Sequence, residues 1–290
     1  MKARAFAYAR PRTLEAAHAA FADAEGDASY ISGGQSLVPA LAMRLQAPAC
    51  LVDLGGIDAL KGIAFDDGVL RIGALTRHAQ ALSDPLIARH APLLTAAAPF
   101  VAHPAIRNRG TLGGSVALAD PASEFPAMML TMDATMEIFG TDGLRDVPAA
   151  DYFQDLYQTA IEPGEILVAL KIPGAAPGTR IAFEELARRR GDYAMVGSGI
   201  MAQVDDGAVA QIAIGFFSVG ATPVRARAVE ALLTGRALDA AAITEAQAAL
   251  DDDLDPPDDT QVPAAMRRHL ARVVLGRLLT RIAGTPGEAP

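Results

Sequence analysis

The spacing of apolar residues predicts an alternation of helices and short strands over the first part of the chain. Leu14, Ala17 and Phe21 share one face of a helix that Thr13 can cap. Short apolar runs bounded by turn residues predict buried strands at 28–31, 50–54, 69–75, 134–139, 144–147 and 166–172. We also expect a helix from Ser36, as its N-cap, through Leu45, a buried helix at 92–101, and a short helix capped by Thr76.

A run of Pro, Gly and Ala at residues 173–178 interrupts this pattern and predicts a linker. After it, apolar runs predict a meander of strands at 181–187, 194–204 and 209–218, followed by helices at 224–234, 240–251 and 264–283. Residues 207–224 lack charge, but their β-favouring residues and interrupting glycines indicate a strand and its turn rather than a membrane span. We therefore predict two domains, at 1–175 and 179–290.

The last helix is expected to be amphipathic, with a basic outer face. Its inner positions are Met266, Leu270, Val273, Leu278 and Ile282, and its outer positions are Arg267, Arg268, Arg272 and Arg281. We expect these arginines to be solvated or salt-bridged, with an acidic partner as the alternative. The acidic run at 251–259 has the composition of a solvated loop.

Composition narrows the classes of function. Hydrophobic residues make up 51% of the 290 residues and charged residues 20%, which is enough apolar material for a large core. The formal net charge of −9 argues against a nucleic-acid partner, because phosphate backbones are bound by clustered Lys and Arg. The absence of Trp and the aromatic content of 5% also disfavour base-stacking surfaces.

A single cysteine limits the chemistry further. Cys50 lies in an apolar run, where we expect a buried small side chain rather than a nucleophile. One cysteine cannot form a disulfide within the chain or supply a cysteine-ligated zinc or iron–sulfur site. The five histidines show no metal-ligand spacing, so we predict no metal site on this chain. No apolar signal core follows the basic first residues, so a cytoplasmic location is expected.

Two glycine pairs, each flanked by hydroxyl residues, are the strongest candidates for a binding site. They are Ser32-Gly33-Gly34-Gln35-Ser36 and Thr111-Leu112-Gly113-Gly114-Ser115. Glycine lets the backbone turn sharply and approach a ligand, and the amides of such turns bind anions. Neither segment has the Rossmann or P-loop spacing, and each alone is compatible with an ordinary turn. Their repetition predicts a ligand with two adjacent phosphates.

Longer segments around the two pairs resemble a known family. Residues 32–39, SGGQSLVP, followed by LVDL at 51–54, are similar to its first FAD loop, and residues 103–115, HPAIRNRGTLGGS, followed by ADPASE at 119–124, are similar to its second. Residues 182–194, with GDYA at the end, and TPVRA at 222–226 resemble its C-terminal domain. The family is the FAD-binding medium subunit of molybdenum hydroxylases, as in carbon monoxide dehydrogenase and xanthine dehydrogenase.

The resemblance implies an α+β fold in two parts. The first part would be a FAD-binding domain of the PCMH type at 1–175, with lobes at about 1–57 and 58–175 that hold FAD between them. The second part, 179–290, would resemble the C-terminal domain of carbon monoxide dehydrogenase flavoprotein, with an antiparallel sheet and helices.

The resemblance also implies which residues bind FAD. The first lobe would hold the diphosphate with Gly33, Gly34, Gln35 and Ser36, and the second lobe with Thr111, Gly113, Gly114 and Ser115. Ser32 and Leu37, which flank the first loop, would also belong to the cofactor-binding residues. Asp120 and Glu124 would lie along the ribityl and ribose groups, and Tyr193 would approach the isoalloxazine ring. The structural alternatives are that Asp120 and Glu124 are charges at a helix N-terminus, that Tyr193 is a core aromatic, and that Arg107 and Arg109 only shape their loop.

Three positions depart from the family pattern. Ser32 stands where alanine is frequent, Leu118 where histidine is frequent, and Glu185 where lysine is frequent. A backbone-mediated site tolerates Ser32. Leu118 and Glu185 change the surroundings expected for the flavin, so no family role is assigned to them.

The implied function is electron transfer within a complex. A large subunit would carry the molybdenum cofactor and the substrate site, a small subunit would carry two iron–sulfur clusters, and this chain would pass electrons from FAD to an external acceptor, in a dimer of heterotrimers. The cofactor supplies the redox chemistry, so we predict no catalytic side chain here. The alternatives are a free-standing FAD enzyme related to alcohol oxidases and a flavin-free structural or assembly subunit.

Overall fold

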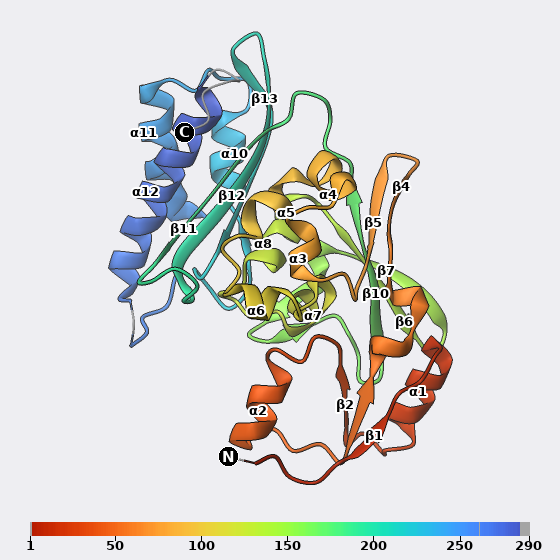
Figure 1. Cartoon of the computed structure of the whole chain (residues 1–290). Helices are drawn as coiled ribbons and strands as arrows, with labels where there is room; N and C mark the ends of the chain where they lie inside the picture. The colour runs from red at the N-terminus through yellow and green to blue at the C-terminus, as the bar shows by residue number, and fades with distance from the viewer. Residues whose placement is uncertain (1, 261, 285–290) are drawn as a thin grey trace.

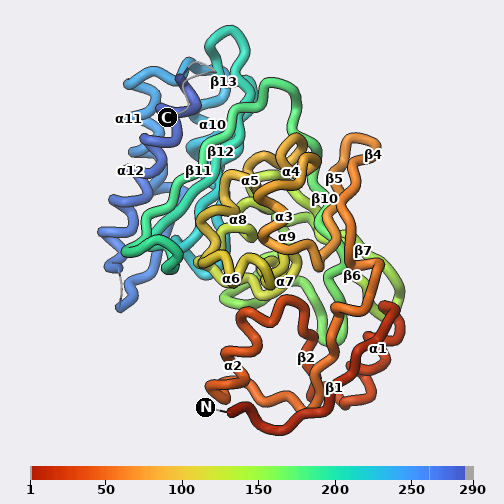
Figure 2. The backbone as a smooth tube through the Cα atoms, viewed as in Figure 1, coloured from red at the N-terminus to blue at the C-terminus, as the bar shows by residue number. Residues whose placement is uncertain are grey.

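Three larger sheets, each with its own helices, follow one another along the chain in the computed structural model, which describes residues 2–260 and 262–284 (Figures 1 and 2). The N-terminal sheet lies at one end of the molecule and the C-terminal sheet with its long helices at the other (Figure 1). This mixture of helices with parallel and antiparallel sheets confirms the predicted α+β class. Residue 1, where the first predicted domain begins, and residues 285–290, where the second one ends, lie outside the described residues.

The first lobe is a small parallel sheet with a helix on each face. Strands β1 (Ala7–Ala9), β2 (Ala28–Ile31) and β3 (Cys50–Asp53) lie in the order β1-β3-β2. Helices α1 (Leu14–Ala22) and α2 (Leu37–Met43) connect them. The two crossovers run in opposite directions across the sheet, so right-handed connections place α1 and α2 on opposite faces (Figure 1). Short 3-10 turns, η1 (Leu54–Gly56) and η2 (Asp58–Leu60), lead out of the lobe.

The second lobe is a five-stranded antiparallel sheet covered by short helices. Its strands β4 (Ile63–Asp66), β5 (Val69–Gly73), β6 (Thr135–Gly140), β7 (Gly143–Pro148) and β10 (Ile166–Pro173) lie in the order β4-β5-β10-β6-β7. The helices are α3 (His78–Ala81), α4 (Pro85–His90), α5 (Pro92–Ala97), α6 (Pro104–Arg107), α7 (Leu112–Leu118), α8 (Glu124–Thr131) and α9 (Ala149–Tyr152). A two-stranded ribbon, β8 (Phe153–Asp155) and β9 (Gln158–Thr159), follows α9.

The C-terminal part is the predicted meander backed by helices. Strands β11 (Arg180–Ala187), β12 (Ala194–Asp205), β13 (Ala208–Phe217) and β14 (Val224–Arg225) pair in sequence order. One face packs on α10 (Arg227–Leu233), α11 (Ala240–Ala249) and α12 (Ala264–Ala283), and η3 (Leu250–Asp252) ends α11. The other face packs on α5 and α8 of the second lobe, which joins the two cores.

Several boundaries differ from the sequence expectations for local reasons. Thr13 caps α1 as predicted, and its hydroxyl accepts a hydrogen bond from the amide of Ala16 at 3.1 Å. Ser36 is the N-cap of α2 as predicted, but its side chain makes no capping hydrogen bond. Arg77, not Thr76, is the N-cap of α3, and residues 224–225 are a strand before α10 begins. Within the segment that resembles the second FAD loop, Pro104–Arg107 form helix α6. No sequence pattern indicated α8, because it is buried on nearly all sides and its apolar residues therefore lack helical periodicity.

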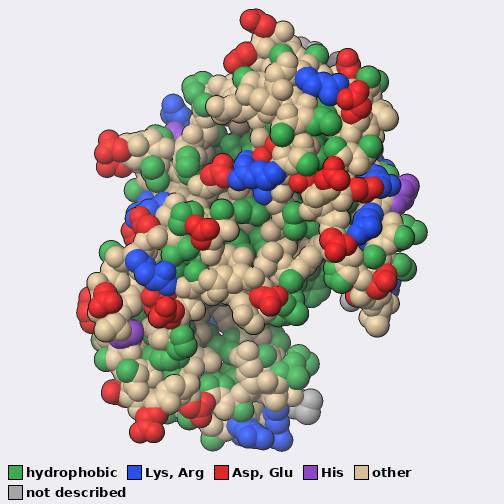
Figure 3. All heavy atoms as spheres, turned by 180° about the vertical axis from the view of Figure 1, so that it is seen from behind, with side chains coloured by type: hydrophobic (Ala, Val, Ile, Leu, Met, Phe, Trp, Pro, Cys, Tyr) green, Lys and Arg blue, Asp and Glu red, His purple; other side chains and the backbone are tan. Residues whose placement is uncertain are grey.

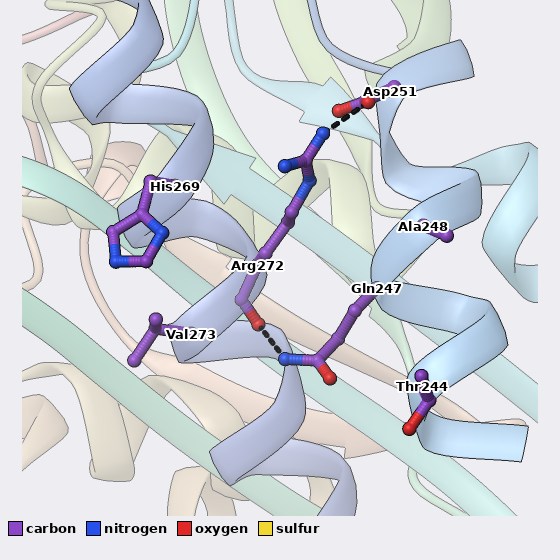
Figure 4. Close-up of a pocket in the computed structure, with 7 residues that line it drawn as sticks. All are labelled: Thr244, Gln247, Ala248, Asp251, His269, Arg272 and Val273. Atoms are coloured by element: carbon purple, nitrogen blue, oxygen red, sulfur yellow. Dashed lines mark hydrogen bonds and ion pairs between the residues drawn. The ribbon is translucent and has the colours of Figure 1, made fainter. Parts of the chain in front are cut away.

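The basic face of α12, which was expected to be solvated or salt-bridged, is salt-bridged, and Arg268 and Arg272 pair with Asp255 and Asp251 of the acidic run. Arg267 is only 7% exposed and donates to the carbonyls of Met195 and Ser218, whereas Met266, expected inside, is 51% exposed. Figure 4 shows Arg272 of α12 pointing at Asp251, and Gln247 of α11 donating to the Arg272 carbonyl at 2.7 Å. The acidic residues are therefore structural counter-charges and not a free loop. Among the described helices, none is long and apolar enough to cross a membrane.

Candidate functional site

The first glycine pair forms the turn between β2 and α2. Gly34 has a φ of +71°, a left-handed conformation that glycine adopts without strain. The side chain of Gln35 folds back and donates to the Gly33 carbonyl at 3.1 Å, which holds the turn in shape. Among the described residues, the backbone amides of Gly34, Gln35 and Ser36 have no hydrogen-bond acceptor. Adjacent free amides in a turn are donors for an anion.

The second glycine pair forms the first turn of α7. Thr111 is the N-cap, and its hydroxyl accepts from the amide of Gly114 at 3.0 Å. The amides of Leu112 and Gly113 donate to carbonyls of the strand end below, at 2.8 and 3.0 Å. A Cβ on Gly113 would lie 2.4 Å from the Cβ of Ala74, so this glycine permits close packing of α7. The second loop therefore offers hydroxyls rather than free amides, and the expected contact of Gly113 with FAD stays a prediction.

The structure brings the two loops into direct contact. The hydroxyls of Ser32 and Thr111 lie 3.2 Å apart, although 79 positions separate them in the sequence. A Cβ on Gly33 would lie 2.4 Å from the carbonyl oxygen of Arg109 and 2.8 Å from the Cα of Gly110. Gly33 is therefore the residue that allows the backbones of the two lobes to meet. One anionic ligand can contact the free amides of one lobe and the hydroxyls of the other.

The remaining predicted residues gather beyond α7. The Ser115 hydroxyl lies 2.7 Å from that of Ser123, which immediately precedes Glu124 at the start of α8. Asp120 is buried. Its carboxylate accepts hydrogen bonds from the amide of Ala122 at 2.9 Å and from the phenol of Tyr157 at 3.3 Å. Helix α7 therefore connects the place where the two glycine loops meet, at Thr111, with the group formed by Ser123, Glu124 and Asp120. Leu37, the first residue of α2, is half-buried, and Ser36 is exposed.

Tyr193 lies in the hairpin between β11 and β12, and burial together with the Asp120 carboxylate raises its pKa to about 12. It is 68% exposed, which excludes the alternative that it is a core aromatic. A Cβ on Gly191 of this hairpin would lie 2.6 Å from the ring of His103, so the hairpin rests against the N-terminus of α6, the helix that ends at Arg107. Arg107 itself donates to the carbonyls of Val101 and Ala102 at 2.9 and 3.0 Å, as expected for a residue that shapes its loop.

Two carboxyl groups, Glu124 of α8 and Glu185 of β11, are close enough for the charge of Glu124 to affect the pKa of Glu185. Burial raises the pKa of Glu124 to about 7, and the nearby Asp120 carboxylate adds to this. Burial also raises the pKa of Glu185 to about 8, with a further contribution from Glu124. Within the described residues, the buried Oε2 of Glu185 has no hydrogen-bond partner. The departure from lysine at position 185 therefore creates a site where one proton is held near neutral pH.

We predict that Glu185→Gln changes the pH dependence of stability. A carboxyl whose pKa is raised on folding binds its proton more tightly in the folded state, so the protein loses stability as pH rises from about 4.5 to 8. The variant should be more stable than the wild type at pH 8, by about 2 kcal/mol, which is half of what the full pKa shift would give because the partly exposed side chain is screened by solvent, and equally stable below pH 4.5. Urea denaturation at both pH values measures this, with Glu15→Gln, an exposed site, as control. Parallel pH profiles of the variant and the wild type would contradict it.

His78 supports the second loop, and sequence reasoning missed it. Its Nε2 donates to the carbonyl of Thr111 at 2.8 Å, and its ring packs on Phe125 with the centroids 5.1 Å apart. It is 6% exposed, and this burial lowers its pKa to about 4, so the ring is neutral at physiological pH. His78 therefore holds the backbone of Thr111, whose hydroxyl contacts Ser32 of the first loop. A lone histidine at the start of a short helix gave no sequence signal for this role.

We expect His78→Leu to weaken FAD binding about tenfold, because the Thr111 carbonyl loses the His78 donor and keeps only the Ser115 amide. His78→Gln, which retains an N–H donor, should restore most of the affinity. Because the pKa of His78 is lower in the folded than in the unfolded state, the wild type loses stability as pH falls from about 6.5 to 4, and the Gln variant should lose less. FAD titration and acid unfolding test this, with the exposed His269→Gln as control; a Leu variant with wild-type affinity would refute the role.

Comparison with known protein families identifies the chain. Residues 4–175 match the FAD binding domain in molybdopterin dehydrogenase, and residues 181–282 match the CO dehydrogenase flavoprotein C-terminal domain. The chain belongs to this family of FAD-binding subunits. The resemblance of the two loops to those of molybdenum hydroxylase medium subunits is therefore confirmed, and FAD is the cofactor of this chain.

Relatives and solved structures agree along nearly the whole chain. The chain is 36% identical to the 6-hydroxypseudooxynicotine dehydrogenase complex subunit alpha of Paenarthrobacter nicotinovorans, over 97% of this chain and 95% of that one. It is 36% identical to the carbon monoxide dehydrogenase medium chain of Afipia carboxidovorans, over 95% and 96%. Among solved structures, carbon monoxide dehydrogenase from Hydrogenophaga pseudoflava superposes with a TM-score of 0.94 at 33% identity, over 97% of this chain and 98% of that chain.

The residues present fit FAD. The first loop provides free amides, and glycine keeps Cβ atoms away from the point where the two loops meet. The hydroxyls of Ser32, Thr111 and Ser115 add neutral donors, which suits a diphosphate in a chain with a net charge of −9. Within the described residues, no group of three or more His, Cys, Asp or Glu side chains is arranged to hold a metal ion.

Proposed function

We propose that this chain is the FAD-carrying electron-transfer subunit of a molybdenum-containing hydroxylase. When bound, FAD takes up electrons and passes them to an external acceptor. The chain binds and orients the cofactor, and none of its side chains needs to act as acid, base or nucleophile. The observation that carries the proposal is the contact between two glycine loops from separate lobes, in a chain that belongs to a FAD-binding family.

In this proposal the first loop binds the FAD diphosphate through the amides of Gly34, Gln35 and Ser36, with Gly33 admitting the second lobe. Thr111, Gly114 and Ser115 contact the diphosphate from α7, and Ser32, Leu37 and Gly113 shape the loops. Asp120 and Glu124 line the ribityl and ribose groups. Tyr193, whose phenol is close enough to the Asp120 carboxylate for its pKa to be raised, covers the isoalloxazine ring from the C-terminal hairpin.

The partners follow from the same proposal. A large subunit carries the molybdenum cofactor, and a small subunit carries two iron–sulfur clusters that reduce FAD. We propose a dimer of these heterotrimers in the cytoplasm. We also propose that the FAD-binding domain ends at residue 175 and that the C-terminal domain begins at residue 179; proteolytic cleavage confined to 173–178 would support this boundary.

Ligand discrimination tests the function. FAD has the diphosphate that the two loops recognise, whereas FMN has a single phosphate and riboflavin has none. We expect the purified chain to be yellow and to bind FAD at least about 100-fold more tightly than FMN, a difference of about 2.7 kcal/mol. Equal affinity for FAD and FMN would remove the diphosphate assignment. A chain that shows no flavin absorbance after FAD is added would instead be a structural subunit, and an active yellow monomer that oxidises an alcohol unaided would be a free-standing enzyme.

A further inference from the structure

Tyr157 is an exposed aromatic residue at a backbone position that disfavours it. It is the second residue of the two-residue turn that joins β8 and β9, and its φ is +55°. This left-handed conformation favours glycine or asparagine and is strained for a bulky side chain. The stability of the turn therefore gives no reason for a tyrosine here, whereas strained backbone of this kind is frequent at binding sites.

The base of the β8–β9 ribbon is anchored in the second lobe. Tyr152, the last residue of α9, is fully buried and packs edge-on against Phe153, with the ring centroids 4.9 Å apart. Its carbonyl accepts from the amide of Ala160 at 2.8 Å, which closes the ribbon. Strand β9 also contacts α7, the helix that begins after Thr111. A fixed base thus presents Tyr157 beside the helix that contains the second glycine pair.

The phenol of Tyr157 reaches a carboxylate of the candidate site. It donates to Oδ2 of the buried Asp120 at 3.3 Å, and the side chain nevertheless stays 54% exposed. Exposure alone marks no site, because hydrophobic side chains are interspersed with charged ones of both signs over the surface, as one face of the molecule shows (Figure 3). An aromatic ring that a buried carboxylate orients, and that remains open to solvent, is available to a ligand.

A second exposed tyrosine lies near the same carboxylate. Partial burial of the phenol, followed by the Asp120 carboxylate, raises the pKa of both Tyr157 and Tyr193, and Tyr157 adds to the shift of Tyr193. The two phenols are therefore close together, although one comes from the second lobe and the other from the C-terminal hairpin. In a chain with five tyrosines and no Trp, two tyrosines converge at this place.

Two aromatic side chains at one place suit a planar aromatic ligand, because flat ring systems bind through their faces. The proposed function puts the isoalloxazine ring of FAD at Tyr193 and the diphosphate at the glycine loops. The second glycine pair lies in the first turn of α7, and Asp120 follows two residues after its last, so the helix length of about 10 Å separates them. Tyr157 therefore lies at the flavin end of the site and not at the diphosphate end.

We propose that Tyr157 is a further flavin-binding residue, which contacts the isoalloxazine end of FAD together with Tyr193 and is oriented for this contact by Asp120. This inference rests on the proposed function. Its consequence is that the ring of Tyr157 contributes to the binding of ligands that contain a flavin, and not to the binding of the diphosphate itself.

The test compares FAD with ADP, which has the diphosphate and no flavin, on the purified full chain. Tyr157→Asn removes the ring and supplies a residue that accepts a left-handed backbone. We expect FAD to bind about tenfold more weakly, which is the effect of losing one aromatic contact, and ADP to bind with unchanged affinity. The fluorescence of bound FAD should rise, because a phenol in contact with a flavin quenches its emission.

Two further variants complete the test. Tyr157→Phe keeps the ring and loses only the bond to Asp120, so it should regain most of the affinity for FAD. Leu144→Asn is the matched control, because Leu144 is 59% exposed on the β6–β7 hairpin and should affect neither ligand. Thermal unfolding without FAD checks that each variant folds.

The outcomes separate this residue from the function. If Tyr157→Asn binds FAD with wild-type affinity, Tyr157 does not contact the flavin, and the proposed function stands. If the affinities for FAD and ADP fall equally, Tyr157 only supports the segment around Asp120, and the inference is wrong. If the wild type binds no FAD, the proposed function itself fails.

Discussion

Gly33→Ala is expected to weaken FAD binding about 100-fold while the chain remains folded. The added methyl carbon would lie 2.4 Å from the Arg109 carbonyl oxygen and 2.8 Å from the Cα of Gly110. Both are backbone atoms that cannot rotate away. The loops must then move apart, and forcing an extra carbon into a tight contact costs about 1–3 kcal/mol. That cost falls on the arrangement that binds the diphosphate from both lobes, and about 2.7 kcal/mol corresponds to 100-fold in affinity.

A matched substitution distinguishes this contact from a general effect of losing a glycine. Gly220 also has an ordinary φ, but a Cβ there would meet its nearest neighbours at 3.6 and 3.8 Å, which are normal contacts. Gly220→Ala should therefore bind FAD like the wild type. The measurement is FAD titration by fluorescence, with thermal unfolding as the check on folding. If Gly33→Ala keeps wild-type affinity, the two loops do not act together on one ligand.

The sequence predicted the fold well where periodicity was strong. The meander of β11, β12 and β13 was predicted because each strand is long and apolar, and Thr13 marked the start of α1. It failed where burial removes periodicity, as in α8, and where tertiary contacts decide orientation. Arg267 was expected outside because arginine is usually exposed, but backbone carbonyls of β12 and of the segment after β13 satisfy it inside.

The candidate site was found from sequence only in part. Two anion-binding turns were predicted from the glycine pairs, and the family resemblance supplied the ligand. What the chain pattern does not contain is the contact between the turns: Gly33 against Arg109, Ser32 against Thr111, and His78 beneath Thr111. These residues are far apart in sequence, and no local rule relates them. Glu185 shows the same limit, because its raised pKa arises from burial and from Glu124 on another element.

Gly114→Asp is expected to abolish FAD retention, and here the cause is charge. A Cβ on Gly114 would lie 2.7 Å from the Thr111 hydroxyl and 2.9 Å from the Ser32 hydroxyl, so the new side chain projects into the place where the loops meet. A carboxylate about 4 Å from a phosphate charge costs about 4 kcal/mol at an effective dielectric constant near 20, which corresponds to about 1,000-fold in affinity.

Gly114→Asn is the control, because asparagine has nearly the same shape without the charge. Both variants must displace the same two hydroxyls, which are side-chain atoms able to rotate, so Asn should lose only about tenfold in affinity. The gap between Asp and Asn should narrow in high salt, where charges are screened within about 3 Å at 1 M. Equal losses for Asp and Asn would mean that Gly114 matters through shape and that the diphosphate lies elsewhere, whereas a salt-sensitive gap would place a ligand phosphate beside the N-terminus of α7.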